Sequence, residues 1–209
     1  MSKTVRIGGG HAHFEDTMDG YAGLLDAGVD YIVCDFLAEL TMAFLAKDVR
    51  GNPDGYSPAL LRDFRPWLKR ILDSGAKIVT NWGGINPKGA GAALGQMAGE
   101  LGLSPRIAVI EGDDLRPRAN ELQARNLHDM FNGRPLPEGA KIASINAYLG
   151  AFPIASSLDA GADIVITGRV VDSALSLGAL IHEFGWTAQD HDRLAAGTLV
   201  GHLLECSSQ

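Results

Sequence analysis

The chain has 209 residues, of which 46% are hydrophobic and 21% are charged, as in an ordinary soluble globular protein. Its formal net charge is −7 and no run is rich in Lys or Arg, which excludes a general nucleic-acid or anionic-membrane surface as partner. With two cysteines, no secretion signal and no apolar stretch of membrane-spanning length, we expect a cytoplasmic protein with free thiols.

Short apolar runs alternate along the chain with longer amphipathic runs. The apolar runs predict strands at 5–7, 30–35, 77–80, 106–110, 141–145 and 163–167. The amphipathic runs predict helices over 15–27, 37–47, 58–72, 89–101, 118–131, 149–160, 173–184 and 193–205. This alternation predicts a single α/β domain over residues 1–209, with a mainly parallel sheet flanked by helices. We favour an open three-layer sheet over a partial β/α barrel, although periodicity does not distinguish the two.

Polar segments follow the predicted strands. They lie at 8–16, 34–39, 81–87, 111–114, 146–150 and 167–172. Open parallel sheets and barrels both bind ligands at the carboxyl ends of their strands. Six such segments exceed what turns require, so we predict a binding or active site at this edge of the sheet.

The first polar segment contains three consecutive glycines between a predicted strand and a helix. Gly9 and Gly10 could let the backbone approach a substrate phosphate, although a tight turn explains them equally well. The spacing is not that of a dinucleotide-binding loop. His11 and His13 could ligate a metal or relay protons, but such a pair is more often solvated or caps a helix.

Asp35 and Glu39 frame the next strand-to-helix turn. Four residues apart, they could bind a metal or act as acid and base. The structural alternative is that Asp35 caps the helix and Glu39 lies near its favourable dipole end.

The third polar segment carries amides and glycines but no charge. Asn81, Gly83, Gly84 and Asn86 could bind an oxyanion or a carbonyl oxygen of a substrate. The alternative is a turn that leads into a helix at Pro87. We favour the substrate-binding interpretation because these residues exceed what a simple turn needs.

The following segments add charged candidates. Adjacent Asp113 and Asp114 could hold a hard metal cation, or could form a solvated turn. Tyr148 could donate to a carbonyl, but a buried tyrosine with a satisfied hydroxyl is more common. Arg169 could bind a carboxylate or phosphate, with Asp172 as its orienting partner or as a base. A capping Asp172 in a structural ion pair is the alternative.

His202 and Glu205 lie three residues apart on the last predicted helix. They could bind a metal from one helix face, but no second ligand pair is visible. We expect a core histidine with a satisfied ring.

Several of these segments resemble the acyclic terpene utilisation (AtuA-like) family. The matching blocks are 31–42 (YIVCDFLAELTM), 81–91 (NWGGINPKGAG), 111–115 (EGDDL), 146–175 and 194–206. The resemblance runs from Gly8 to the last residue, with departures at Phe36, Trp82 and the His11–His13 segment. Similar proteins continue well beyond the last block, which implies that this chain is truncated inside a domain.

The resemblance implies a setting in branched acyl or acyl-CoA catabolism. We expect an enzyme of lyase, hydratase or isomerase type that acts on a small carbonyl-bearing or CoA-linked acyl substrate, with a divalent metal as a candidate cofactor. Asp35, Glu39 and Asp172 would handle protons or the metal, while Asn81, Asn86 and Arg169 would hold the substrate. The alternative is a binding or assembly subunit, or an inactive fragment, that pairs with itself or with a complementary C-terminal polypeptide.

Overall fold

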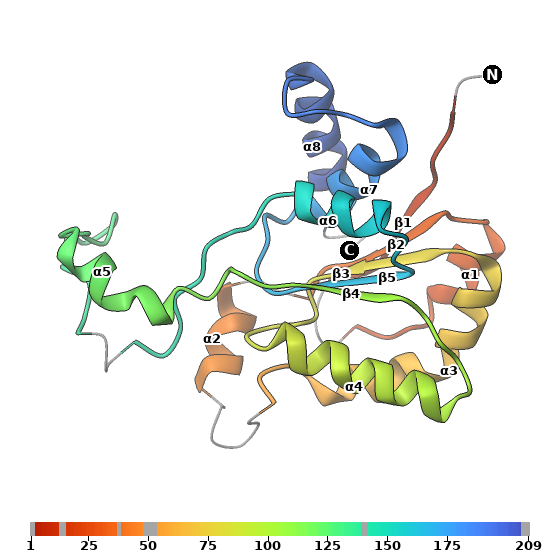
Figure 1. Cartoon of the computed structure of the whole chain (residues 1–209), viewed down its shortest axis with the longest axis horizontal. Coiled ribbons are helices and arrows are strands. Elements are labelled where there is room, and N and C mark those ends of the chain that lie inside the picture. The colour runs from red at the N-terminus through yellow and green to blue at the C-terminus, as the bar shows by residue number, and fades with distance from the viewer. Residues whose placement is uncertain (1–2, 13–15, 37–38, 48–53, 139–141, 206–209) are drawn as a thin grey trace.

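Five parallel strands form the centre of the molecule. The structure is a computed structural model, and it describes residues 3–12, 16–36, 39–47, 54–138 and 142–205, without the side chains of residues 59 and 60. The strands are β1 (Ile7–His11), β2 (Tyr31–Cys34), β3 (Lys77–Thr80), β4 (Ile107–Ile110) and β5 (Ile164–Thr167). Their order is β1-β2-β3-β5-β4 (Figure 1). Within the described chain β1 and β4 are unpaired edges, so the sheet is open and the barrel alternative is wrong.

Helices cover both faces of the sheet (Figure 1). One face carries α1 (Tyr21–Asp26), α3 (Pro58–Ser74) and α4 (Pro87–Glu100), and the other carries α6 (Phe152–Asp159), α7 (Ala174–Phe184) and the outer α8 (His191–Glu205). Strand residues alternate between the two cores: Ile32 and Cys34 face the first group, and Tyr31 and Val33 face the second. This two-sided burial confirms the predicted three-layer α/β architecture.

The glycines of the first polar segment lie inside β1, whereas the sequence predicted a loop after a strand at 5–7. Gly9 pairs with Val33 of β2, and a bulge separates Gly9 from His11. A Cβ on Gly8 would lie 2.5 Å from Leu24 Cδ2, so this glycine allows α1 to pack closely against the strand. The loop prediction at Gly9 and Gly10 is therefore wrong, because both lie within β1, and a Cβ on Gly10 would lie 2.7 Å from Ile32 Cγ2.

The segment between β4 and α6 differs most from the prediction. In place of a helix over 118–131, the chain forms a short 3-10 turn (Arg116–Arg118) and α5 (Ala119–Ala124). Asn126 then adopts a left-handed conformation with φ of 52°. Residues 142–145 of the predicted strand at 141–145 form no strand, and Lys141 lies outside the described residues.

We call the described residues 115–138 and 142–145 the arm, because they project away from the sheet beyond the carboxyl ends of the strands (Figure 1). Met130 and Phe131 are 86% and 89% exposed, respectively. Helices and strands gain most of their stability from burying an apolar face. Among the described residues, Met130 and Phe131 have no surface that buries their side chains. The arm therefore lacks the packing that the predicted helix and strand require.

The remaining helix, α2 (Glu39–Lys47), follows β2 and lies, like the arm, at the carboxyl ends of the strands (Figure 1). None of the described helices is both long and apolar enough to cross a lipid bilayer.

Candidate functional site

Four polar side chains follow four neighbouring strands at one edge of the sheet. Asp35, Asn81, Asp113 and Arg169 come directly after or within three residues of β2, β3, β4 and β5, respectively. All four are buried, with at most 7% of each residue exposed. We call this edge the rim and define it by residues 35–36, 81–86, 111–114 and 167–172. Because the strands are parallel, the rim gathers residues that are far apart in sequence.

Asn81 connects two of these strand ends. Its Nδ2 donates to Asp35 Oδ1 at 2.6 Å, and its Oδ1 accepts from the backbone N–H of Phe36 at 2.7 Å. The amide is completely buried, so both its hydrogen-bonding ends are used within the protein. Asn81 therefore fixes the direction of the Asp35 carboxylate.

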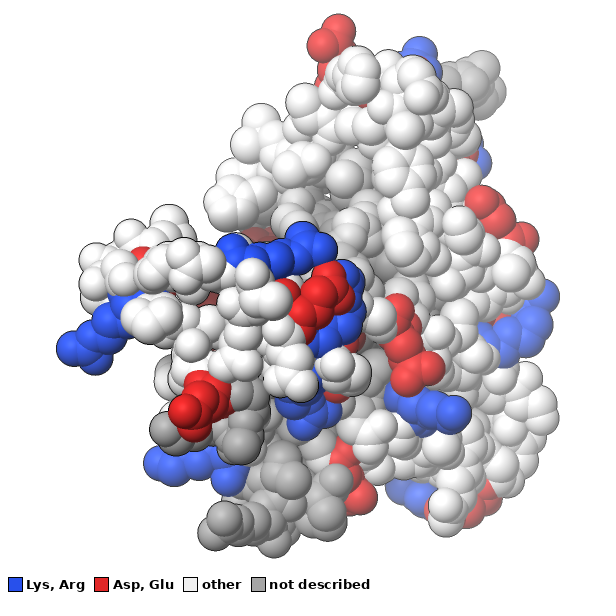
Figure 2. Space-filling model, turned by 60° about the vertical axis from the view of Figure 1, so that its left-hand side comes forward, with Lys and Arg blue, Asp and Glu red and all other residues white. Residues whose placement is uncertain are grey.

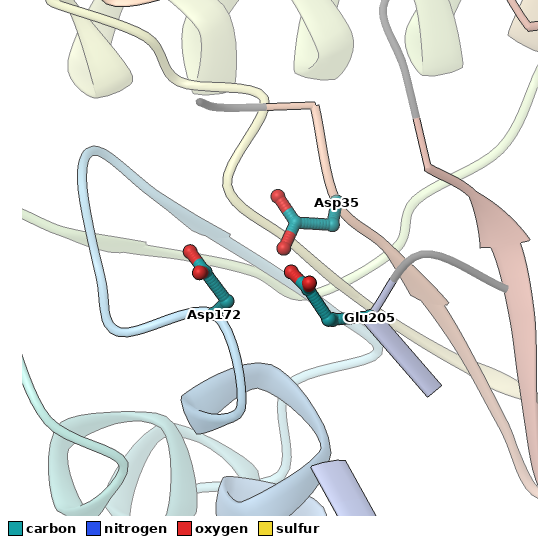
Figure 3. Close-up of side chains that lie close together, drawn as sticks. All are labelled: Asp35, Asp172 and Glu205. Carbon is teal, nitrogen blue, oxygen red and sulfur yellow. The ribbon is translucent and has the colours of Figure 1, made fainter. Parts of the chain in front are cut away.

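Three carboxylates converge beside the rim, and we call Asp35, Asp172 and Glu205 the carboxylate cluster. One oxygen of each lies within 4.8 Å of one oxygen of each of the others. Figure 3 shows that they come from the end of β2, the loop before α7 and the end of α8. Negative charges this close repel unless a proton or a cation compensates them, and carboxylate oxygens suit Mg²⁺, Ca²⁺ and Mn²⁺.

Glu205 was not among the residues that the sequence predicted for the site. The sequence pattern that involved Glu205 was its spacing of three residues from His202, and His202 was expected to lie in the core. That expectation is wrong, because His202 is exposed. Close packing brings the end of α8 to the rim: a Cβ on Gly201 would lie 2.5 Å from the backbone oxygen of Ser173, next to Asp172.

Arg169 lies at the centre of a second group of contacts. Its side chain is 3% exposed, and it donates to Asp172 Oδ1 at 2.9 Å and to Glu39 Oε1 at 3.1 Å. Its guanidinium carbon lies 4.2 Å from the centroid of the Tyr148 ring. The Tyr148 hydroxyl donates to the same Glu39 oxygen. Asp172 thus belongs both to this group and to the carboxylate cluster.

These contacts set the charge states of the group. The hydrogen bond from Tyr148 and, to a smaller extent, Arg169 hold the pKa of Glu39 below its usual range. Burial acts to lower the pKa of Arg169, but the contact with Tyr148 and the charges of Asp172 and Glu39 outweigh it, so this pKa is raised. Tyr148 itself is 50% exposed and is not the buried tyrosine expected from the sequence. Arg169 and Glu39 are therefore both charged at neutral pH.

Asp113 and Asp114 have separate contacts. Asp113 Oδ2 accepts from Asn146 Nδ2 at 2.8 Å and from the backbone N–H of Arg169 at 2.9 Å, which ties the start of the arm to the end of β5. Asp114 pairs with Arg116 at 2.8 Å, and this hydrogen bond lowers the pKa of Asp114. Neither belongs to the carboxylate cluster.

The glycines and the second amide of the third segment have structural contacts. Gly83 N–H donates to the Thr167 backbone oxygen at 3.0 Å, and Gly84 has a left-handed φ of 58°. Asn86 caps α4 by accepting from Gly89 N–H at 2.9 Å. Of this segment, Asn81 is the residue that contacts the carboxylate cluster.

A second polar group, formed by His11, Tyr21 and Cys34, lies in the core at the ends of β1 and β2. His11 Nδ1 and Cys34 Sγ each lie 3.0 Å from the Tyr21 hydroxyl, and His11 Nε2 has no hydrogen-bond partner among the described residues. Burial lowers the pKa of His11 to about 4 and raises the pKa of Cys34 to about 12, so both are neutral at pH 7. The solvated alternative for His11 is wrong, since it is 2% exposed, and His13 lies outside the described residues.

Charged side chains on the visible face of the molecule are mixed in sign. Figure 2 shows Lys and Arg interspersed with Asp and Glu around the base of the arm, without a continuous patch of either sign on that face.

The comparison with protein families gives one result. The family model described as "Acyclic terpene utilisation family protein AtuA" matches residues 5–209. No curated protein and no solved structure gave a significant match. Because the family match covers nearly the whole sequence and includes every segment of the rim, the chain belongs to the acyclic terpene utilisation family.

Proposed function

We propose that the rim is the active site of an enzyme of branched acyl or acyl-CoA catabolism, with lyase or hydratase chemistry on a carbonyl-bearing substrate. The observation that carries this proposal is the convergence of the carboxylate cluster beside the buried Arg169. Closely spaced ionisable groups at strand ends are typical of catalytic sites in open α/β sheets. Membership of the acyclic terpene utilisation family supports the choice of substrate class.

Each part of the site has a role in this proposal. Arg169 would hold an anionic or carbonyl oxygen of the substrate, because its planar fork offers two parallel donors. In the absence of a bound cation, Asp35, which Asn81 orients through a 2.6 Å hydrogen bond, would move a proton at the carbon beside the carbonyl. Asp172 lies between Asp35 and Arg169, and its hydrogen bond to Arg169 would hold the guanidinium in place against the substrate.

The carboxylate cluster fits a divalent cation. Asp35, Asp172 and Glu205 would hold it through oxygen ligands, and their mutual repulsion gives a reason for a cation to bind there. When bound, such a cation would polarise a substrate carbonyl.

Asp35→Asn and Glu205→Gln test the cation site. Each change removes a charged ligand, so Mn²⁺ affinity measured by calorimetry should fall more than about tenfold, the lower end of what even outer-shell changes cause. Asp114→Asn is the matched control, because its carboxylate pairs with Arg116 outside the cluster and should leave affinity unchanged. Equal Mn²⁺ affinity in all three variants and the wild type would contradict a cation at this position.

Asp172→Asn tests the enzymatic proposal itself. In this variant, turnover of branched acyl-CoA substrates should fall at least about 100-fold, as expected for a positioned proton-handling or orienting group.

The second candidate function is a non-catalytic binding or assembly subunit. The observation in its favour is the arm, whose Met130 and Phe131 side chains are among the most exposed large apolar groups of the described chain. Unchanged turnover in Asp172→Asn, together with loss of complex formation when the arm is altered, would favour this second function.

A further inference from the structure

Glu39 is the accessible partner of a buried arginine. The Glu39 side chain is 74% exposed, whereas that of Asp172 is 37% exposed and that of Arg169 is 3% exposed. An exposed ion pair is weak and exchanges easily with other charges. A buried guanidinium without an anionic partner, by contrast, costs free energy. Nη2 of Arg169, which bonds the exposed Glu39, is therefore the position at which another anion could replace Glu39.

Two donors converge on a single carboxylate oxygen at this position. Glu39 Oε1 accepts from Arg169 Nη2 at 3.1 Å and from the Tyr148 hydroxyl. The Tyr148 ring stacks on the guanidinium at 4.2 Å and so fixes the direction of both donors. A cationic fork and a phenolic hydroxyl aimed at one point form a binding site suited to a carboxylate.

The geometry points to a specific ligand class, and this inference rests on the proposed function of the rim. We propose that Arg169 and Tyr148 form a subsite for the carboxylate of an acidic acyl substrate, and that Glu39 fills this subsite until the substrate displaces it. Glu39 is then a specificity-determining residue: only a ligand that replaces its charge gains entry to Arg169.

Two further features favour a monoanionic carboxylate over a phosphate. Asp172 stays bonded to the other side of Arg169 at 2.9 Å, so a ligand of nearly two negative charges would be repelled more strongly than one of a single charge. The displaced Glu39 remains in the first turn of α2, where the helix dipole stabilises a negative charge. Exchange of the two carboxylates therefore leaves no charge stranded in an apolar environment.

Isovalerate, a branched monocarboxylate, is a probe for this subsite, and its dissociation constant can be measured by NMR titration of the whole chain. Glu39→Gln removes the competing charge, so isovalerate should bind about 1.4- to 5-fold tighter, the range that an exposed ion pair is worth. Tyr148→Phe removes one donor and should weaken binding about tenfold in the Glu39→Gln background. Arg169→Lys should weaken it further, because the stacked planar fork is lost.

Glu121→Gln is the matched control, because Glu121 also bonds two side chains, Arg118 and Arg125, at 2.7 Å but lies on the arm. It should leave the affinity for isovalerate unchanged. No gain in Glu39→Gln, absence of isovalerate binding to that variant, or equal binding of inorganic phosphate would each overturn the subsite. Mn²⁺ titration of the same samples separates the outcomes: retained Mn²⁺ binding with no isovalerate effect overturns the subsite alone and leaves the proposed function standing.

Discussion

The rim and the arm contain arginine–carboxylate pairs of nearly the same geometry in opposite environments. Arg169 bonds Asp172 at 2.9 Å in the rim, and Arg118 bonds Glu121 at 2.7 Å in the arm. The side chain of Arg169 is 3% exposed and that of Arg118 is 55% exposed. Breaking a buried pair leaves an uncompensated charge away from water, whereas an exposed pair exchanges with solvent at little cost. Distance alone therefore does not reveal which pair holds the structure in place.

Removal of each arginine should give the largest difference between the two regions. Arg169→Met removes the buried donor of two charged hydrogen bonds and leaves Asp172 without its cation, so it should lower the free energy of unfolding by about 1.5–3 kcal/mol. Arg118→Met should leave it unchanged within error. Urea denaturation followed by circular dichroism measures both, and equal losses in the two variants would refute the distinction drawn from burial.

Acidification should separate the core beside the rim, which contains His11, from the arm, which contains His128. Burial lowers the pKa of His11 from 6.5 to about 4, so below pH 6.5 the unfolded chain binds a proton that the folded chain does not. Stability therefore falls as the pH drops from 6.5 toward 4, by no more than about 3 kcal/mol for this group. His11→Phe should remove that part of the pH dependence of the unfolding free energy.

The control for this measurement is His128→Phe, because His128 is exposed on the arm. It should keep the pH dependence of the wild type between pH 4 and 6.5. The interpretation of His11 fails if the two variants respond to acid in the same way.

The smallest effect is expected at the end of the arm. Met130→Ser combined with Phe131→Ser changes side chains that are 86% and 89% exposed, so the unfolding free energy should stay within about 0.5 kcal/mol of the wild type. Thermal and urea denaturation test this directly. A larger loss would show that these residues pack against something in solution, and size-exclusion chromatography would then reveal a change in assembly.

Strands that are buried on both faces could be predicted from the sequence, because they appear as continuous apolar runs. β2 and β5 were predicted to within two residues at each end, because their apolar runs lie between two helical layers. The gathering of Asp35, Asn81 and Arg169 at one edge followed from parallel strands alone. The arm was mispredicted, since its helix-like pattern at 118–131 is buried at Ala119 but exposed throughout from residue 124 to residue 131.

The carboxylate cluster shows where sequence reasoning ends. Asp35 and Asp172 were candidates because they follow strands, but Glu205 closes the last described helix, and its pairing with His202 did not place it at the rim. Its position depends on how closely α8 packs against the start of α7, where Gly201 faces Ser173. Such a contact is a property of the assembled layers and cannot be predicted from local spacing.

The strand order also determines when the rim is completed during synthesis. β5 lies between β3 and β4 although it follows both along the chain, and in the described sheet β4 pairs only with β5. During synthesis, β4 therefore has no partner strand until β5 has left the ribosome, and an unpaired strand edge is prone to aggregation. Asp113 and Arg169 meet in the same event, so a nascent chain that has not yet produced β5 lacks both a finished sheet and a complete rim.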